Sequence, residues 1–422
     1  MTRPETTLTF LAVALATVAA LSAPGAAAGV DWPWWGGPNG DFTVEATGLA
    51  EAWPEDGPRE LWRRALGEGY SAITVVGDRL YTMYRRGETE IVVALAAASG
   101  DTIWETEYDS PTDERDWSFD RGPGPHATPA VHAGRVFAVG STNRFHALEA
   151  ETGEVLWSYD FLQDFDGSFR HRGYSASPLV YRDTVIIPVG GSGQGVMAFR
   201  QADGEVVWKA GDDDASYASP ILIDLDGETQ VAAFAANEIV GIDPDSGRFL
   251  WSHPHPTRGA FNISTPLWSA DDRLLFASSA YDGGGRVLRL SGTGTDTRVE
   301  ELWFSNQVRI HFGTAIRIGD TVYASSGDFG PAPMKAVDIA TGDVLWQDRS
   351  FAKHSLVHAD GKLVLLDEDG VLGLLRVDRD GVEVLARAQV FDSLSWTVPT
   401  LVGTKLYARN REEIVALELG GR

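Results

Sequence analysis

The fold of this 422-residue chain is decided by the stretch 152-TGEVLW-157, in which a Thr-Gly turn is followed by a tryptophan four residues after the glycine. The same arrangement occurs five times and ends at Trp104, Trp157, Trp208, Trp251 and Trp346. A sixth tryptophan, Trp303, stands in a similar segment whose turn is expanded to Ser291–Arg298. Successive tryptophans are 43 to 53 residues apart. A period of about 40–50 residues is typical of a repeated supersecondary unit.

One repeat contains four short runs that are rich in β-branched and aromatic residues. In the second copy the runs begin at Pro129, Arg135, Phe145 and Val155, and glycine or polar turns separate them. This pattern predicts a four-stranded antiparallel sheet. No long stretch has the 3.6-residue period of a helix, so we predict an all-β fold. The equivalent tryptophans are predicted to pack between neighbouring sheets, because each has a large ring to bury and an indole N–H to satisfy.

The number of copies predicts a closed ring. Seven units contain four strands, and they end near Trp104, Trp157, Trp208, Trp251, Trp303, Trp346 and Leu385. An eighth unit runs from Trp396 to Leu419 and lacks a fourth strand, whereas the segment Glu60–Leu66 has no hairpin partner. We therefore predict an eight-bladed β-propeller of four-stranded antiparallel blades, with the ring closed by this N-terminal strand. The closure would tie both ends of the domain into one sheet.

The first 28 residues have the pattern of a secretory signal peptide. Arg3 gives a positive start, Phe10 to Leu21 is apolar, and Ala26-Ala27-Ala28 fits a cleavage site. The apolar run is shorter than the roughly 20 residues that span a bilayer. We expect cleavage near Ala28 and a periplasmic or secreted protein, with an N-terminal extension at residues 29–59 and the propeller at 60–422. Since the chain has no cysteine, we expect neither a lipid anchor nor a disulfide.

The charge of the chain limits its partners. The formal net charge is −25, and only five of the 35 basic residues are lysines. Such an acidic surface repels nucleic acids and anionic membranes. We therefore expect no nucleic-acid binding and no membrane insertion, and a monomer whose partner is an envelope or extracellular protein or a small ligand.

The copies resemble the pyrroloquinoline-quinone (PQQ) repeat, whose pattern is roughly Ala-x-Asp-x-x-Thr-Gly-x-x-x-Trp. The clearest match is 336-AVDIATGDVLW-346, and the chain from Trp32 onward is similar to the family of secreted PQQ-binding-like propellers. Segments at Gly124–Pro129, His311–Thr314 and Trp396–Pro399 resemble the blade openings of that family. The resemblance implies an eight-bladed ring. It leaves the activity open, because the family includes quinone-dependent alcohol and sugar dehydrogenases as well as a scaffold protein of outer-membrane assembly.

The dehydrogenase alternative requires residues that the chain lacks. The resemblance implies that such an enzyme would carry a vicinal cysteine pair, a calcium site of Glu, Asn and Asp, and a catalytic Asp. The chain has no cysteine. Of the residue types that such a calcium site needs, we find only Asn262 and Asn306 at blade openings. We therefore expect no cofactor and no calcium-dependent dehydrogenase activity, and leave open whether the protein is an enzyme; PQQ with calcium belongs only to the dehydrogenase alternative.

Other metal motifs are also incomplete. His253-Pro254-His255 has two imidazoles at a ligand spacing, but no cluster that would complete a metal site. The run Asp212-Asp213-Asp214 lacks the spaced ligands of a calcium loop, so both segments are interpreted as solvated turns.

The start of each inner strand places one set of residues around the mouth of the central channel. These candidate pocket residues are Tyr70, His126, Arg172, Tyr174, Tyr217, Asn262, His311, Lys353 and Trp396. One interpretation is that the rings plug the mouth and the polar groups bond to backbone. The other is a pocket for a planar or anionic ligand, with rings for stacking and cations for charge.

Two long connections join the same face of the predicted ring. They run from Asp109 to Pro125 and from Asp160 to Gly173, and their candidate partner-binding residues are Arg115, Trp117, Phe165, Arg170 and His171. Long loops on a rigid scaffold are where binding residues concentrate. We therefore predict a binding or scaffold module for a protein or small ligand at this face. The alternatives are a PQQ-dependent dehydrogenase and a polysaccharide-binding propeller.

Overall fold

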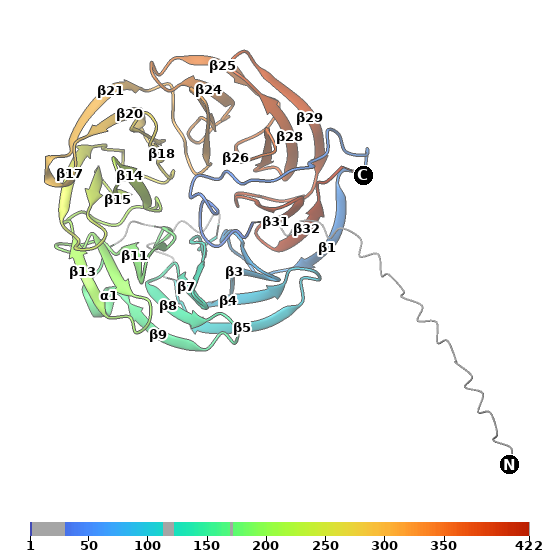
Figure 1. Cartoon of the computed structure of the whole chain (residues 1–422), viewed down its shortest axis with the longest axis horizontal. Coiled ribbons are helices and arrows are strands. Elements are labelled where there is room, and N and C mark those ends of the chain that lie inside the picture. Colours follow the sequence, from blue (N-terminus) through green and yellow to red (C-terminus); the bar gives the residue numbers. More distant parts are fainter. Residues whose placement is uncertain (2–29, 113–121, 169–171, 422) are drawn as a thin grey trace.

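The computed structural model describes residue 1 and residues 30–112, 122–168 and 172–421 of the chain. Eight four-stranded antiparallel sheets stand around a central axis, as Figure 1 shows in the view down the ring. The predicted eight-bladed, all-β propeller is therefore confirmed. The predicted signal peptide lies outside the described residues, apart from Met1.

The blades follow one another along the chain, and we number them from 1 to 8 in that order. Blade 1 contains β2 (Thr74–Val76), β3 (Arg79–Arg86), β4 (Thr89–Ala96) and β5 (Thr102–Asp109). Blade 2 contains β6 (Ala130–His132), β7 (Arg135–Val139), β8 (Arg144–Glu149) and β9 (Val155–Asp160). Blade 3 contains β10 (Leu179–Tyr181), β11 (Thr184–Pro188), β12 (Val196–Arg200) and β13 (Val206–Ala210). Blade 4 contains β14 (Ile221–Leu225), β15 (Glu228–Phe234), β16 (Glu238–Ile242) and β17 (Phe249–Pro254).

The second half of the ring repeats this order. Blade 5 contains β18 (Leu267–Ser269), β19 (Leu274–Ser279), β20 (Gly284–Ser291) and β21 (Arg298–Ser305). Blade 6 contains β22 (Ala315–Ile318), β23 (Thr321–Ser325), β24 (Met334–Asp338) and β25 (Val344–Asp348). Blade 7 contains β26 (His354–Ala359), β27 (Lys362–Asp367), β28 (Val371–Val377) and β29 (Val382–Gln389). Two short helices, α1 (Phe161–Phe165) and the 3-10 helix η2 (Gly294–Asp296), lie in connections.

Blade 8 is built from both ends of the domain, as the sequence predicts. It contains β30 (Thr400–Val402), β31 (Lys405–Arg409) and β32 (Glu413–Glu418), with β1 (Arg59–Ala65) as its outer strand. The N-terminal strand pairs antiparallel with β32, so that Arg63 lies opposite Val415. The closing strand begins one residue earlier than predicted.

The repeated tryptophan joins each blade to the next. Trp104 of blade 1 donates its indole N–H to the carbonyl of Ala150 in blade 2 at 3.0 Å. Its ring lies against the turn glycine of blade 2: a Cβ on Gly153 would come within 2.5 Å of the Trp104 ring. Gly153 has a φ of +76°, which L side chains disfavour, so the turn and the packing both require glycine. The predicted packing between sheets is confirmed at this position.

The same contact recurs at five more junctions of the ring; blade 7 has Leu385 in place of the tryptophan, and Trp251 bonds differently. Indole N–H groups reach carbonyls of the following blade at 2.8–3.1 Å from Trp62, Trp157, Trp208, Trp303 and Trp346. Trp251 instead donates to Gln230 Oε1 of its own blade at 2.8 Å. The next blade has the expanded Ser291–Arg298 turn, so the short turn glycine is missing where Trp251 would need it.

The N-terminal extension lies along the inner strands. Trp32 forms a bridge with Val75 in the middle of β2, and the Val44 N–H donates to the His358 carbonyl on β26 at 3.0 Å. Farther along, the Leu49 N–H donates to Asp360 at 2.9 Å. In Figure 1 this blue segment crosses from the centre of the ring to its rim beside blades 7 and 8. The extension therefore connects blades 1, 7 and 8 in addition to the closing strand.

A buried arginine also secures the closure. Arg409 on β31 is 0% exposed, and its guanidinium donates to the carbonyls of Gly67, Ser71 and Met83 on the side of blade 1. Burial lowers the pKa of Arg409 to about 9, so the group stays charged at neutral pH. Carbonyl oxygens satisfy this buried cation in place of a carboxylate.

Within the described part of the chain, no helix is long and apolar enough to cross a bilayer.

Candidate functional site: a cavity at the channel mouth

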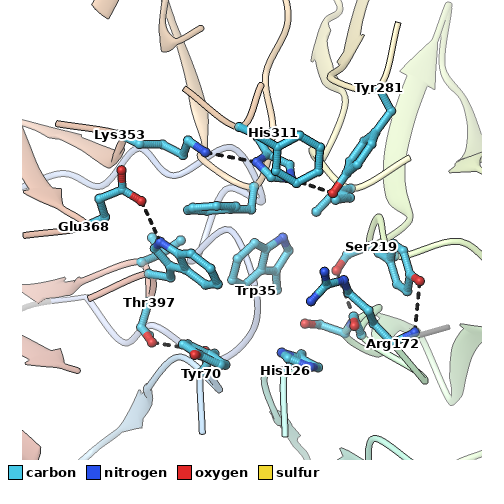
Figure 2. A pocket seen from close by; sticks show the side chains of 18 residues that line it. Trp35, Tyr70, His126, Arg172, Ser219, Tyr281, His311, Lys353, Glu368 and Thr397 are labelled. Atoms are coloured by element: carbon cyan, nitrogen blue, oxygen red, sulfur yellow. Dashed lines mark hydrogen bonds between the residues drawn. The ribbon is translucent and has the colours of Figure 1, made fainter. Parts of the chain in front are cut away.

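A cavity of about 460 Å³ lies on the ring axis, in the range of small-ligand pockets. Its walls come mainly from the segments that precede the inner strands, which is where the sequence places the channel mouth. The lining residues are Trp35, Tyr70, His126, Arg172, Ser175, Ser177, Tyr217, Ser219, Ile263, Tyr281, His311, Phe312, Phe329, Lys353, Glu368, Trp396, Thr397 and Val398. Figure 2 shows many of their side chains converging around Trp35.

Seven of the nine candidate pocket residues line this cavity: Tyr70, His126, Arg172, Tyr217, His311, Lys353 and Trp396. The other two are turned into the protein. Tyr174 is 2% exposed and donates its hydroxyl to the Val189 carbonyl at 2.8 Å. Asn262 is 0% exposed; its amide donates to the Ala235 carbonyl at 2.8 Å and accepts from Ser279 Oγ at 2.6 Å. Both side chains connect backbone within the ring and are not part of the cavity wall.

The candidate partner-binding loops are only partly described. Arg115, Trp117, Arg170 and His171 lie outside the described residues. Phe165 ends α1, and its ring packs against Tyr159 and Phe199 at centroid distances of 5.0 and 5.7 Å. Lys209 Nζ lies 4.9 Å above the same ring. Phe165 therefore anchors its loop to blade 3.

One side of the cavity is aromatic. Tyr70 stacks on Trp396 and on His126, each at 5.5 Å between ring centroids, and the planes of Tyr70 and His126 are 6° apart. Phe312 extends the surface, 4.6 Å from Trp396. The indole of Trp396 is held by Glu368, whose Oε2 accepts its N–H at 3.0 Å. Trp396 belongs to blade 8 and Tyr70 to blade 1, so this wall spans the closure of the ring.

Trp35 forms the inner end of the cavity. It comes from the N-terminal extension, whose neighbouring residues bond to the later parts of inner strands, and it donates its indole N–H to Thr265 Oγ1 at 2.8 Å. Figure 2 places it at the centre of the converging side chains.

Hydroxyl groups line the part of the cavity made by blades 3 and 4. Two of them accept a backbone N–H from the preceding blade: the Thr128 N–H donates to Ser177 Oγ at 2.9 Å, and the Ser177 N–H donates to Ser219 Oγ at 2.9 Å. These bonds fix the positions of Ser177 and Ser219 at the axis. They also leave each hydroxyl proton available for another acceptor.

A hydrogen-bonded row of three side chains completes the wall. Lys353 Nζ donates to His311 Nδ1 at 3.1 Å and to the Asp328 carbonyl at 2.8 Å. His311 Nε2 lies 2.7 Å from the Tyr281 hydroxyl, and Figure 2 shows the row along the upper edge. Burial, with Lys353 and Arg172 nearby, lowers the pKa of His311 to about 3. The imidazole is therefore neutral at neutral pH, and one of its nitrogens must accept.

Two further groups set the charge of the cavity. Burial and the neighbouring Arg172 lower the pKa of His126 to about 4, so this imidazole is neutral as well. Glu368 is the one carboxylate among the described lining residues, beside the two cations Arg172 and Lys353. The cavity is thus cationic in a protein whose net charge is −25.

Sequence reasoning missed several lining residues. Trp35 precedes the repeats, and Tyr281 and Phe329 lie in loops after β19 and β23. Phe329 is 69% exposed and lies 5.5 Å from the His311 ring centroid. The sequence signal that could have identified Phe329 is a phenylalanine within the short segment 327–330, which has a glycine at each end. Nothing in the sequence distinguishes Trp35 from its neighbour Trp34.

The residues around the cavity do not fit a PQQ–calcium centre. No group of three or more metal-ligating side chains occurs in the part of the chain that the structure describes. His253 faces Glu301 at 3.5 Å, whereas His255 packs against Phe234, so these two imidazoles do not converge. Glu368 is already engaged by Trp396, and the sequence has no cysteine to cover a quinone. The donor set required for that cofactor is missing from the described cavity.

Comparison with known proteins identifies the family of the chain. The profile of the PQQ_2 family, described as "Outer membrane protein assembly factor BamB", matches residues 88–330, which is more than half of the chain. The chain belongs to this family. The BamB-family assignment agrees with the repeat that the sequence displays.

Individual relatives fall into two groups. Outer membrane protein assembly factor BamB of Shewanella oneidensis is 21% identical over 353 residues, which cover 72% of this chain and 88% of the relative. The structure of BamB from Moraxella catarrhalis covers 85% of this chain and 97% of its own, with a TM-score of 0.60 and 18% identity, which shows a shared fold. Quinohemoprotein alcohol dehydrogenase ADH-IIG of Pseudomonas putida is 30% identical over 148 residues, but these cover 34% of this chain and 20% of the enzyme.

Proposed function

We propose that this BamB-family propeller is a non-catalytic binding module of the cell envelope that holds a protein partner at its cavity-bearing face. The match to Shewanella BamB along most of both chains supports a module of this kind. The predicted signal peptide, with cleavage near Ala28, supports a periplasmic location. The partner is an envelope protein, and the propeller acts as a scaffold.

The observation that carries the proposal is the exposed aromatic rim of the cavity. Phe329 is 69% exposed beside Tyr281 and His311, with edge-to-face ring contacts of 5.4 and 5.5 Å. Aromatic residues, phenylalanine included, are enriched in protein interfaces, so an exposed ring that is held by other rings suits a docking surface.

The described lining residues are also poorly suited to acid–base catalysis. A general base must be within hydrogen-bond reach of its proton and have a pKa near the working pH. The pKa values of His126 and His311 are lowered to about 4 and about 3, and Glu368 accepts from Trp396. None of the three is suited to remove a proton from an alcohol at neutral pH.

The dehydrogenase alternative is favoured by one observation, the local 30% identity to ADH-IIG. It predicts quinone absorbance and dye reduction with an alcohol after the protein is mixed with PQQ and calcium. Turnover under these conditions would contradict the binding proposal and show that the protein is an enzyme. The polysaccharide alternative rests on the exposed aromatics alone.

The experiment that tests the scaffold role is crosslinking in envelope preparations, with the partner identified by mass spectrometry. We expect Phe329→Glu to abolish one specific crosslink. The matched control is Phe249→Glu, since Phe249 is 43% exposed on the outer strand β17, away from the cavity. A crosslink that survives Phe329→Glu, or that Phe249→Glu removes equally, argues against this face as the docking surface.

A further inference from the structure

Within the described part of the cavity, one cation has no acidic partner. Arg172 lines the cavity, and its backbone N–H bonds to the Tyr217 hydroxyl at 3.2 Å. None of the ion pairs found among the described residues includes its guanidinium, although 60 acidic residues are present in the chain. A guanidinium presents a planar fork of donors that matches a carboxylate.

Hydroxyl protons stand beside this guanidinium. Ser177 Oγ and Ser219 Oγ each accept a backbone N–H, and neither donates to a described residue. Figure 2 shows Ser219 and Arg172 on the same side of the cavity. Their remaining hydrogen-bonding capacity is therefore that of donors, and it is available to a group inside the cavity.

The Lys353–His311–Tyr281 row supplies a further donor. The Lys353 ammonium donates to His311 Nδ1, so the proton of the neutral imidazole is on Nε2. Nε2–H then donates to the Tyr281 oxygen at 2.7 Å. The tyrosine oxygen is the acceptor in this bond, which leaves its own O–H to point toward another acceptor. Lys353 and His311 are therefore positioning residues: they orient the Tyr281 hydroxyl so that its O–H can donate to a group in the cavity.

These donors face the aromatic wall across the axis. Ser219 precedes the inner strand of blade 4, and Trp396 precedes that of blade 8, so the two stand on opposite sides of an eight-bladed ring. Arg172 and Tyr281 belong to blades 3 and 5, on either side of Ser219. One wall therefore offers donors for an oxyanion, and the opposite wall offers flat rings for stacking.

We infer that the cavity binds one carboxylate carried on a flat apolar body, that is, an aromatic monocarboxylate. The carboxylate lies between Arg172, Ser219 and Tyr281, and the ring stacks against Tyr70 and Trp396. The donor wall holds one unpaired cation, which suits a single anionic group. This inference rests on the proposed function in placing a ligand at the same face, but it concerns the cavity and not the rim.

Calorimetric titration with three naphthalene probes tests the inference. The probes are 2-naphthoate, the neutral 2-naphthamide and the cationic 2-naphthylmethylammonium. We expect 2-naphthoate to bind at least tenfold more tightly than the amide, since charge-assisted hydrogen bonds exceed neutral ones, and the ammonium probe not to bind. Equal affinities for the three probes, or no binding of 2-naphthoate at millimolar concentration, would overturn it.

Substitutions of the cavity residues test which side chains contact the ligand. We expect Arg172→Gln to weaken 2-naphthoate binding tenfold to a hundredfold and Tyr281→Phe about three- to tenfold, with little change for 2-naphthamide. The control Arg182→Gln removes an exposed arginine paired with Asp245, outside the cavity, and should leave binding unchanged. Lys353→Met should weaken binding less once Tyr281→Phe is present, because both act through the same hydroxyl. Additive losses in the double variant would contradict the row as a positioning device.

Two more probes distinguish the source of the carboxylate. N-acetylphenylalanine has the carboxylate of a protein chain end, and its amide is the matched control. Tighter binding of N-acetylphenylalanine than of 2-naphthoate indicates a chain end, and the reverse indicates a free aromatic acid. PQQ with calcium binding more tightly than either, with the same dependence on Arg172, would overturn the single-carboxylate inference. Loss of the Phe329 crosslink without any effect on naphthoate affinity, or the converse, separates this inference from the scaffold role.

Discussion

Trp62 of the N-terminal strand lies against Gly100 in the turn of blade 1. A Cβ on Gly100 would come within 2.7 Å of the Trp62 ring, and the Trp62 indole N–H donates to the Ala97 carbonyl at 3.0 Å. This is the contact that Trp104 makes with Gly153 between blades 1 and 2. The junction at which the ring closes therefore uses the same packing as a junction between blades that are continuous in sequence.

Gly100→Ala is expected to destabilise the protein by about 2–4 kcal/mol, because it adds an overpacking cost to the strain at a φ of +75°. Gly134→Ala is the matched control: its φ is +74°, and no atom lies within 4 Å of the added methyl group. Urea midpoints of the two variants isolate the contact with Trp62. Equal losses of stability in the two variants would mean that the Trp62 ring moves aside without cost and that the closure does not depend on this packing.

Deletion of Glu60 to Leu66 removes the outer strand of blade 8 together with Trp62. We expect the edge of β32 to be left unpaired, with a lower melting temperature and loss of cooperative unfolding. Circular dichroism at increasing temperature measures both. A truncated protein that melts like the full chain would contradict the composite blade.

Arg409→Met removes the guanidinium donor of the Gly67 and Met83 carbonyls, whereas the Ser71 carbonyl still accepts from the Thr82 hydroxyl at 3.1 Å. Each unsatisfied buried group costs about 1–3 kcal/mol, so we expect a loss of at least about 2 kcal/mol in the free energy of unfolding. Arg387→Met, which changes an exposed arginine above the Phe351 ring, serves as control. A loss no greater than that of the control would show that the methionine side chain compensates by packing.

Stability should fall as the pH decreases from about 6.5 to about 3. Burial lowers the pKa values of His146, His255 and His354 to about 4, 3 and 4 in the folded protein. Below pH 6.5 the unfolded chain binds protons that the folded protein does not, so acid favours unfolding; above pH 6.5 the effect is absent. Each group contributes roughly 3–5 kcal/mol at the acid end of this range.

His255→Leu separates this effect from general acid denaturation. The variant should reduce the pH dependence of the urea midpoint between pH 6.5 and 3 by about one proton. His132→Leu is a suitable control, because the His132 ring is half-buried and bonded to Gln201 at 2.9 Å. An unchanged slope in His255→Leu would show that the imidazole is protonated without cost in the folded state.

The ring, the number of blades and their closure could be predicted because each copy repeats the same turn and tryptophan. The position of the cavity followed from the order of strands, since residues that open inner strands must meet at the axis. Which side chains turn toward the axis could not be predicted. Tyr174 and Asn262 stand at blade openings, but nearby carbonyls in blades 3 and 4 draw them inward. Contacts such as Tyr281 with His311 join segments of different blades and leave no periodic signal.

The connection of the N-terminal extension and β1 to the last blades has a consequence for biosynthesis. The segment from Trp32 to Ala65 leaves the ribosome before any blade, but its partners His358, Asp360 and β32 are among the last residues made. The inner end of the cavity and the final sheet can form only when synthesis is nearly complete. Until then the nascent chain holds its first strand without a partner. The cavity is therefore a property of the finished chain and cannot be acquired blade by blade.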